Sequence, residues 1–386
     1  MSFSISDQIK YIGADDTDLD LFESQYIVPN GVSYNSYLIL DEKIAVMDTI
    51  DKRKTEEWLA NLAGELGDKM PDYLVVSHME PDHAASIERA ANTYPSMKIV
   101  GNMKTLQMMK QFFETDFTDR FVEVKEGDKL SLGEHELTFL MAPMVHWPEV
   151  MVEYESKEKI LFSADGFGKF GALSADEDWA CEARRYYFNI VGRYGAQVQA
   201  LLKKAATLDI QTICPLHGPI LTENLSYYID KYNTWSSYTP EDKGILVASA
   251  SIHGNTKAAA LKLVEKLEAT GVKVAFTDLT RDDMAEAIED AFRYDRMVIC
   301  ACTYDGGLFP AAESFIAHLK SKNYQNRTVG FMENGTWAPM AAKHMRAAFE
   351  TMKNITLLDS VVTIKSTLNK DSEAQMDALV EALLAE

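Results

Sequence analysis

The chain has 386 residues, of which 47% are hydrophobic and 25% are charged, and its formal net charge is −21. This length accommodates two domains, and the composition is that of an ordinary globular protein. The negative charge argues against nucleic acid and against an anionic membrane as partners. No apolar run is long enough to span a bilayer, and the acidic start lacks the features of a signal peptide. We therefore expect a cytoplasmic protein.

The first part of the sequence mixes strands with helices. Residues 32–51 predict a hairpin with a turn at Asp41–Glu42. Further strands are expected at 71–78, 98–102 and 212–218, β-structure at 121–165, and helices at 52–67, 84–95, 104–113 and 185–208. This pattern, with metal-type residues at strand ends, favours an αβ/βα sandwich with a site at one edge of its sheets.

The pattern changes after residues 226–244, whose polar and turn-rich composition indicates a link between domains. Five apolar strands then alternate with five helices, which predicts a doubly wound, five-stranded parallel sheet. The expected strands are 244–250, 272–279, 296–302, 327–333 and 356–364, and the helices are 256–271, 282–293, 311–322, 339–353 and 373–386. We place the two domains at residues 1–243 and 244–386.

A dense set of metal-ligand residues occurs at His78-Met79-Glu80-Pro81-Asp82-His83. In an extended segment, residues i, i+2 and i+4 point to the same side, so His78, Glu80 and Asp82 can converge, with His83 turning in from the adjacent loop. A single histidine is more often an ordinary buried residue than a ligand. Packing, however, does not require four ligand residues within six positions, so we predict a metal site.

Three further candidate ligands, His146, Asp165 and His217, lie at predicted strand ends. No C-x-x-C pair is present among the four cysteines, which disfavours a rubredoxin-type module and structural zinc sites. Mixed imidazole and carboxylate ligands suit iron, manganese or zinc. Seven ligands are too many for one tetrahedral ion and suit two ions, and Asp165 could bridge them because a carboxylate has two oxygens.

The order of these ligands resembles that of the metallo-β-lactamase superfamily, whose hydrolases carry H-x-H-x-D-H. Glu80 stands here in place of the second histidine, which is the form typical of flavodiiron proteins (A-type flavoproteins). An additional anionic ligand stabilises the +3 state of iron and so favours redox chemistry over hydrolysis. The resemblance implies two iron ions, one held by His78, Glu80 and His146 and the other by Asp82, His83 and His217, with Asp165 between them. Trp147 either lines this pocket or belongs to the core.

Three loops in the second half follow predicted strands, where doubly wound sheets bind ligands. The first combines hydroxyls, a glycine and a helix N-terminus, which suits a phosphate group. Glycines in the other two let the backbone approach a flat ring, and Trp337 could stack on it. The alternative for Trp337 is a packed surface aromatic, which three such loops at successive strand ends make the weaker interpretation. The candidate residues are Ser251, Ile252, His253, Gly254, Asn255, Thr256, Thr303, Tyr304, Asp305, Gly306, Gly307, Asn334, Gly335, Thr336 and Trp337.

These loops resemble those of short-chain flavodoxins and especially of flavodiiron proteins, which implies that they bind FMN. Two residues depart from the family pattern. Asp305 replaces the asparagine of a common T-Y-N-G-G stretch, and His253 occupies the position of the usual tyrosine in the first loop. Both departures bear on the side-chain contacts and on the potential of the flavin.

The resemblance implies an oxidoreductase that reduces O2 to water, NO to N2O, or both, with electrons passing from an external donor through FMN to the di-iron site. Rubredoxin is the common donor of the family, and coenzyme F420 serves methanogen relatives. We expect a separate donor and a head-to-tail homodimer or a dimer of dimers.

The alternatives are a zinc-dependent metallo-β-lactamase-type hydrolase with a fused flavodoxin-like domain, and an electron carrier whose metal site has decayed. The ligands alone do not separate O2 from NO.

Overall fold

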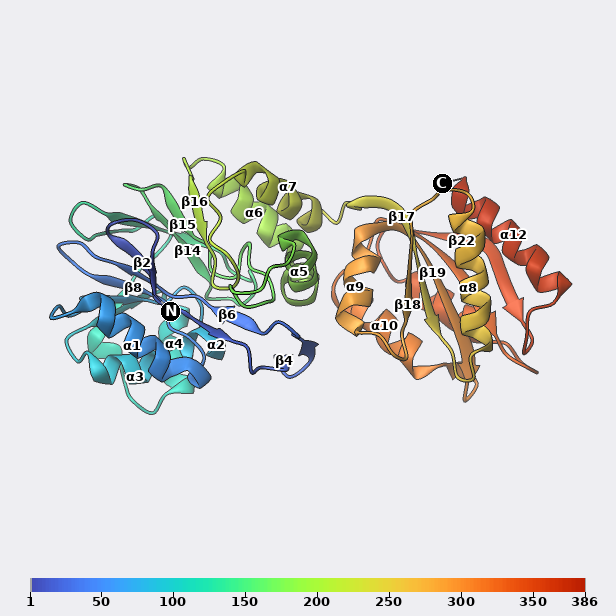
Figure 1. Ribbon diagram of the computed structural model, residues 1–386, viewed down its shortest axis with the longest axis horizontal. Coiled ribbons are helices and arrows are strands. Elements are labelled where there is room, and N and C mark those ends of the chain that lie inside the picture. The colour runs from blue at the N-terminus through green and yellow to red at the C-terminus, as the bar shows by residue number, and fades with distance from the viewer. Residues whose placement is uncertain (1, 386) are drawn as a thin grey trace. The chain divides into compact units, whose positions relative to one another are not determined.

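The computed structural model describes residues 2–385. These residues divide into two compact units (Figure 1). The first comprises the chain up to Tyr186 together with Ala196–Asn233, and the second comprises Tyr187–Gly195 together with the chain from Thr234 onward. Within the described residues, no helix is both long enough and apolar enough to cross a membrane.

The first unit is built on two sheets. The larger sheet has the order β1 (Phe3–Ser4), β2 (Ile9–Tyr11), β7 (Tyr37–Ile39), β8 (Ala45–Met47), β9 (Tyr73–Val75), β10 (Lys98–Gly101) and β11 (Phe121–Glu123). The smaller sheet has the order β12 (Lys129–Ser131), β13 (Glu136–Met141), β14 (Met151–Glu155), β15 (Ile160–Phe162) and β16 (Thr212–Cys214). Two short pairs accompany them: β3 (Ala14–Asp16) with β6 (Val32–Tyr34), and β4 (Leu21–Phe22) with β5 (Tyr26–Ile27).

The two sheets enclose one hydrophobic core. Ile39, Met47 and Val75 from the larger sheet belong to the same buried cluster as Phe139 and Phe162 from the smaller one. Helices α1 (Thr55–Leu66), α2 (Pro81–Ala84), α3 (Ile87–Thr93) and α4 (Met103–Phe112) lie on the side of the larger sheet, and α6 (Gly195–Ala205) and α7 (Leu225–Ser236) lie beside β14–β16 (Figure 1). The predicted αβ/βα sandwich is therefore confirmed.

The expected strand at 32–40 is split in two by a buried polar residue. Asn35 is fully buried, and its side-chain amide donates to the carbonyls of Pro215 and Gly218, both at 2.8 Å. This anchor sends β6 and β7 to different sheets, because the backbone at Asn35 joins the loop after β16 and not a strand ladder. The same anchor fixes the loop that carries His217.

The helix expected at 185–208 is also interrupted. Helix α5 (Trp179–Tyr186) ends there and is followed by a π-helical stretch at Tyr187–Val191, a 3-10 turn at Gly192–Tyr194 and then α6. At Gly195 a Cβ would lie 2.3 Å from the Ser236 carbonyl oxygen and 2.7 Å from the Tyr238 ring. The close approach of these groups explains why a glycine occupies the first position of α6.

The link expected at 226–244 is wrong for most of its length. Residues Leu225–Ser236 form α7, and β17 (Asp242–Ala250) begins six residues later. This stretch is polar overall but carries aromatic residues at helical spacing, and their packing favours a helix. Tyr232 and Trp235 are buried, and the Tyr228 ring lies 4.6 Å from that of Trp179.

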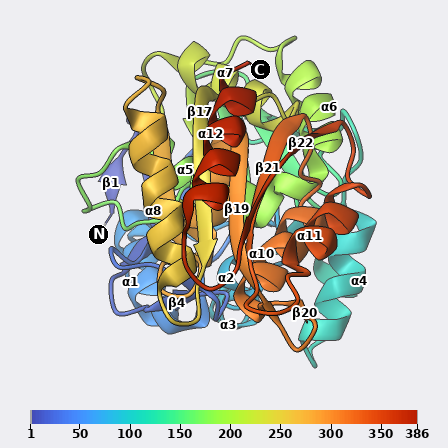
Figure 2. The same ribbon diagram turned by 90° about the vertical axis from the view of Figure 1, so that its right-hand side faces the viewer.

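The second unit is a doubly wound sheet, as predicted. Its strand order is β18 (Val274–Asp278), β17, β19 (Tyr294–Tyr304), β21 (Arg327–Asn334) and β22 (Ile355–Ile364), all parallel, and the short β20 (Gly307–Leu308) pairs antiparallel with β19. Figure 2 shows α8 (Asn255–Glu268) and α12 (Lys370–Leu384) together on one face of the sheet. The remaining helices are α9 (Met284–Arg293), α10 (Pro310–Ser321) and α11 (Ala341–Phe349). Successive strands joined by helices leave the loops at the carboxyl edge free to bind a ligand.

Arg327, at the start of β21, ties several loops of the second unit together. Its guanidinium is buried and donates to the carbonyls of Tyr294 at 2.8 Å, Tyr238 at 2.7 Å and Gln325 at 2.9 Å, and further to those of Asn326 and Phe292. Burial lowers the pKa of Arg327 to about 10. The Arg327 side chain therefore donates hydrogen bonds to several carbonyl oxygens at once, and without it these oxygens would lose those hydrogen bonds.

We expect the R327M variant to lose about 3–5 kcal/mol of unfolding free energy, because a buried methionine leaves these carbonyls without their donor. Urea unfolding of the metal-free and flavin-free protein, followed by circular dichroism, measures the change. The exposed Arg281, which donates to the neighbouring Thr280 carbonyl, provides the matched control R281M. A loss below about 1 kcal/mol for R327M would contradict this account.

Candidate metal centre and flavin site

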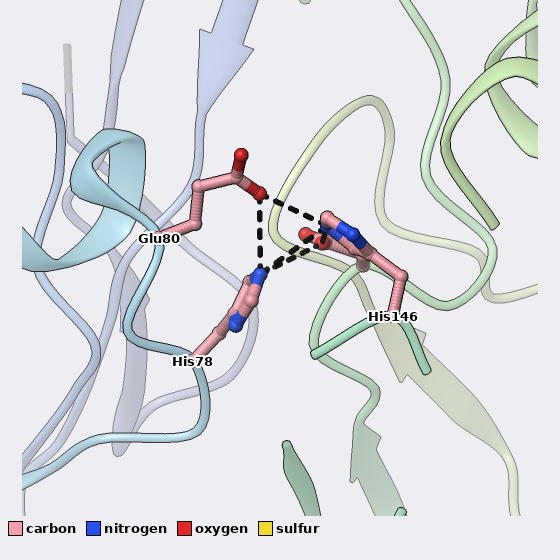
Figure 3. Close-up of side chains that lie close together, drawn as sticks. His78, Glu80 and His146 are labelled. Carbon is pink, nitrogen blue, oxygen red and sulfur yellow. Dashed lines mark hydrogen bonds and ion pairs between the residues drawn. The ribbon is translucent and has the colours of Figure 1, made fainter. Parts of the chain in front are cut away.

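The first ligand group comes from three separate loops of the first unit. His78 and Glu80 follow β9, while His146 lies between β13 and β14 (Figure 3). Glu80 Oε2 lies 2.9 Å from His146 Nε2 and 3.3 Å from His78 Nε2. Asp165, after β15, places Oδ2 3.1 Å from His146 Nε2 and 3.3 Å from His78 Nε2. The ligand atoms of these four residues all lie within 4.8 Å of one another.

The second group is formed by Asp82, His83 and His217, whose ligand atoms also lie within 4.8 Å of one another. Asp82 Oδ2 is 3.1 Å from His217 Nε2 and 3.3 Å from His83 Nε2. The extended geometry expected for this part of the motif is wrong. Pro81 starts helix α2, so Asp82 and His83 belong to a helical turn and face a different group from His78 and Glu80.

Asp165 lies between the two groups. Its Oδ2 faces His78 and His146, whereas its Oδ1 lies 3.3 Å from His83 Nε2 and 3.9 Å from His217 Nε2. One carboxylate therefore presents a different oxygen to each group. This is the arrangement that a carboxylate bridge between two metal ions requires.

The cluster fits cations better than it fits a metal-free state. Both carboxylate oxygens of Asp82 and of Asp165 are buried and, within the described part of the chain, form no hydrogen bond apart from their ion-pair contacts with the ligand histidines. Buried charges left in this way are costly unless they are paired or coordinate a metal. Imidazole and carboxylate without thiolate are ligands that non-haem iron accepts.

Outer contacts fix the orientation of two ligand histidines, and the sequence reasoning missed both. Glu149, which is fully buried, places Oε1 2.8 Å from Nδ1 of His78. The Ser33 carbonyl oxygen lies 2.7 Å from Nδ1 of His217. Such contacts direct the opposite nitrogen, Nε2, toward the metal position. Glu149 could have been noticed as an acidic residue three positions after His146, but the backbone contact of Ser33 leaves no signal in the sequence.

Trp147 lies against the first group. Its ring centroid is 5.4 Å from that of His78 and 6.2 Å from that of His146, in edge-to-face arrangements. Of the two interpretations of Trp147, the structure supports the one in which this ring borders the ligands. The backbone is strained nearby, since Met144 and Ala164 adopt left-handed φ values of 65° and 48° just before His146 and Asp165.

The carboxylates alter the acidity of the histidines in the metal-free protein. Burial alone would lower the pKa of His78, but Asp165, Glu149 and Glu80 outweigh it and hold this pKa well above its usual value. Burial also opposes the rise at His146, yet Asp165 and Glu80 raise its pKa to about 9. At neutral pH these imidazoles are therefore protonated when no metal is bound.

We expect metal affinity to rise with pH between about 6.5 and 9, by about tenfold per pH unit for each proton displaced, because a metal binds only neutral imidazole. The stability of the metal-free protein should change in the opposite direction. Raised histidine pKa values stabilise the fold below about pH 6.5, and this stabilisation is lost as the pH rises through the folded-state values. Chelator competition and proton release measured by calorimetry in two buffers test the first expectation, and thermal melts of metal-free protein test the second. A metal affinity that does not change with pH would contradict the first expectation.

A cavity of about 660 Å³ opens at the carboxyl edge of the second unit's sheet. Thirteen of the fifteen predicted flavin residues line it; the exceptions are Gly254, which precedes α8, and Gly307, which lines a neighbouring groove. Cys302, Ala338, Met340 and Ser366 complete the lining. Trp337 is 90% exposed, so it is not the packed surface aromatic of the alternative interpretation.

Hydrogen bonds connect the loops around this cavity. The Asn334 amide donates to Thr256 Oγ1 at 3.3 Å and exchanges two further bonds with the Ser366 backbone. The Thr303 hydroxyl accepts from the amide of Met340 at 2.8 Å. Asn334 and Thr303 therefore hold the loops in place, and Ser366 brings in a fourth loop that the sequence did not suggest.

Comparisons with known proteins match both domains. Residues 32–218 match the ODP family beta lactamase, and residues 246–373 match a flavodoxin domain. An uncharacterized protein of Methanocaldococcus jannaschii is 28% identical over 95% of this chain and 93% of its own length. Diflavin flavoprotein A 1 of Synechocystis is 32% identical over 74% of this chain, which spans only 51% of that relative. An anaerobic nitric oxide reductase flavorubredoxin of Aeromonas hydrophila is 27% identical over 87% of this chain and 70% of its own length.

Solved structures give the same result for the whole chain. Rubredoxin oxygen:oxidoreductase of Desulfovibrio gigas aligns with a TM-score of 0.92 at 25% identity, covering 100% of this chain and 99% of that one. A flavo di-iron protein of Thermotoga maritima shares the fold with a TM-score of 0.91 at 22% identity, covering 100% of this chain and 98% of that one. The two matched domains, their order along the chain and their shared architecture together show that this protein belongs to the flavodiiron (A-type flavoprotein) family, whose cofactors are FMN and a di-iron centre.

Proposed function

We propose that this chain is an oxidoreductase that reduces O2 to water, NO to N2O, or both, with electrons from a separate donor. One observation carries the proposal. Asp165 faces two ligand groups with its two oxygens, and the first group contains Glu80 where the related hydrolases carry histidine. An extra anion at a two-metal site favours redox iron over hydrolytic zinc.

The geometry supports seven metal ligands. His78, Glu80 and His146 would hold one iron, and Asp82, His83 and His217 the other, with Asp165 contributing one oxygen to each. Glu149 and the Ser33 carbonyl would keep the Nε2 atoms of His78 and His217 directed inward. Trp147 borders the first group.

The flavin residues follow in the same way. The loop from Ser251 to Thr256 would hold the FMN phosphate at the start of α8, and the loops at Thr303–Gly306 and Asn334–Trp337 would hold the ring. Bound in these two sites, FMN and the iron pair would supply the electrons that gas reduction consumes. We place the boundary between the two functional domains at residues 243 and 244.

The relatives suggest the donor. Flavorubredoxin and rubredoxin oxygen:oxidoreductase both carry rubredoxin in their names, which supports a rubredoxin-type donor for this chain. Coenzyme F420 is the alternative. We further propose a head-to-tail homodimer, or a dimer of such dimers, which sedimentation of the loaded protein would test.

Anaerobic stopped-flow mixing of the reduced, iron-loaded protein with O2 or with NO tests the activity. The gas that reoxidises the flavin much faster is the substrate. Its turnover is measured as O2 uptake for the reduction of O2 to water, or as N2O formation for the reduction of NO. Metal analysis of the same sample must give two irons per chain. Two zinc ions, hydrolytic activity and no gas consumption would replace this proposal with the hydrolase. Intact FMN without gas reduction in iron-replete protein would indicate an electron carrier.

A further inference from the structure

The flavin cavity has an unusual balance of charge. Among its described lining residues there is no lysine and no arginine. His253 is the lining side chain that can become cationic, and Asp305 is the lining carboxylate. FMN carries a phosphate with a charge between −1.5 and −2 near neutral pH, by analogy with other phosphate monoesters. Among the described residues that line the cavity, His253 is therefore the side chain that can offer a positive charge to this phosphate.

The nearest lysine along the chain is already engaged. Lys257 lies in the first turn of α8, but its Nζ is 2.8 Å from Oδ2 of Asp278, a carboxylate that is only 5% exposed. Asp278 also accepts from the Thr280 hydroxyl at 2.7 Å. The Lys257 ammonium is thus held at the end of β18 and does not line the cavity.

The backbone next to His253 is open to an anion. Gly254 precedes α8 in the left-handed region, with φ of 91°, and contributes no side-chain cap to the helix. The first amides of α8 therefore lack the usual capping oxygen, and such amides bind phosphate. The Gly254 amide itself donates to Ser251 Oγ at 3.0 Å. His253 is exposed and lies directly beside these amides, at the cavity wall.

We propose that the His253 imidazolium pairs with the FMN phosphate and makes the retention of FMN depend on pH. This inference rests on the proposed function, since it requires FMN in this cavity. It concerns a residue in which the chain departs from the tyrosine usual in the family. The other titratable groups around the cavity are Cys302, Tyr304 and Asp305 of β19 and its following turn, the Lys257–Asp278 pair beyond α8, and His344 of α11, whose Nε2 lies 3.2 Å from the Gly306 carbonyl oxygen.

The sign of the effect follows from the two charges. A phosphate monoester loses its second proton near pH 6, so FMN carries mainly a dianionic phosphate above that pH. Binding of the dianion favours the imidazolium, so the affinity for FMN falls as the pH rises from about 6.5 to 8.5 and the imidazolium is lost. Riboflavin lacks the phosphate, and its affinity should not follow this change.

The test uses full-length protein freed of flavin, titrated with FMN and with riboflavin at pH 6.5 and 8.5, with flavin fluorescence as the readout. We expect the Kd for FMN to increase by about three- to tenfold over this range, while the Kd for riboflavin stays constant. The H253Q variant should bind FMN at pH 6.5 as weakly as the natural protein does at pH 8.5. The H253K variant should bind FMN tightly at both values, and D305N should retain the pH dependence.

An H253Q variant with unchanged FMN affinity and unchanged pH dependence would overturn the proposal. Equal pH dependence for FMN and riboflavin would overturn it as well, because the phosphate would then not be involved. Failure of the proposed function gives a different result, namely normal FMN binding by the natural protein with no reduction of either gas. Circular dichroism of each variant verifies that the second unit remains folded.

Discussion

Under the proposed function, the D165N variant is expected to lose iron from both ligand groups and to consume the gas substrate at least about a hundredfold more slowly. The reason is the position of Asp165, whose Oδ2 lies 3.1 Å from His146 Nε2 and whose Oδ1 lies 3.3 Å from His83 Nε2. Asparagine keeps the shape but removes the charge and one oxygen. Iron content measured by mass spectrometry should fall well below two ions per chain.

Two comparisons make the D165N experiment specific. The H217N variant should weaken mainly the second ion, because His217 belongs to the group with Asp82 and His83. The exposed Asp68, at the end of α1, provides the control D68N, which should retain both ions and full activity. If D165N kept two irons and normal activity, Asp165 would not be the shared ligand.

The second large effect is expected when Glu80 is replaced by histidine, which restores the H-x-H-x-D-H pattern of the hydrolases. Glu80 Oε2 lies 2.9 Å from His146 Nε2, so its charge acts directly on the first ion position. We expect E80H to bind two zinc ions, to raise the midpoint potential of bound iron by on the order of 100 mV, and to lose at least about tenfold in gas reduction. Metal analysis, a redox titration and gas uptake measure the three changes.

The E80Q variant serves as the matched control, because it removes the charge of Glu80 while keeping the length of the side chain. It should shift the potential in the same direction as E80H but should not favour zinc, since an amide is a poor zinc ligand compared with imidazole. A potential of bound iron that is the same in all three proteins would show that Glu80 does not hold the first ion.

Much of this protein could be predicted from local patterns. The doubly wound unit was predicted strand by strand, because each of its strands is a short apolar run followed by an amphipathic helix. The seven candidate ligands could be identified because they are chemically unusual neighbours or stand at strand ends, and the structure brings all seven into two groups. The loops with glycine and hydroxyl residues were recognisable for the same reason.

Other features depend on contacts between distant residues and were missed or predicted wrongly. The link at 226–244 and the single helix at 185–208 were wrong, because buried aromatics such as Trp235 favour a helix in the first, and a π-helical stretch and a 3-10 turn interrupt the second. The extended motif was wrong because Pro81 begins a helical turn. Glu149 and Ser33 acquire their roles only through contacts that span 71 and 184 positions of the sequence.

The sequence by itself therefore determined the two kinds of domain, their order, the chemical nature of the ligands and the departures at Glu80, His253 and Asp305. The domain types and the ligand chemistry follow from residue type and short-range spacing, which the chain carries before it folds, whereas the three departures are evident only against the family pattern that the sequence resembles. The tertiary structure decided how the ligands divide, because Asp82 and His83 turn away from His78 within α2 and Asp165 arrives from a separate strand to face both groups. A division of this kind depends on distances between loops, and only the packing of the two sheets sets those distances.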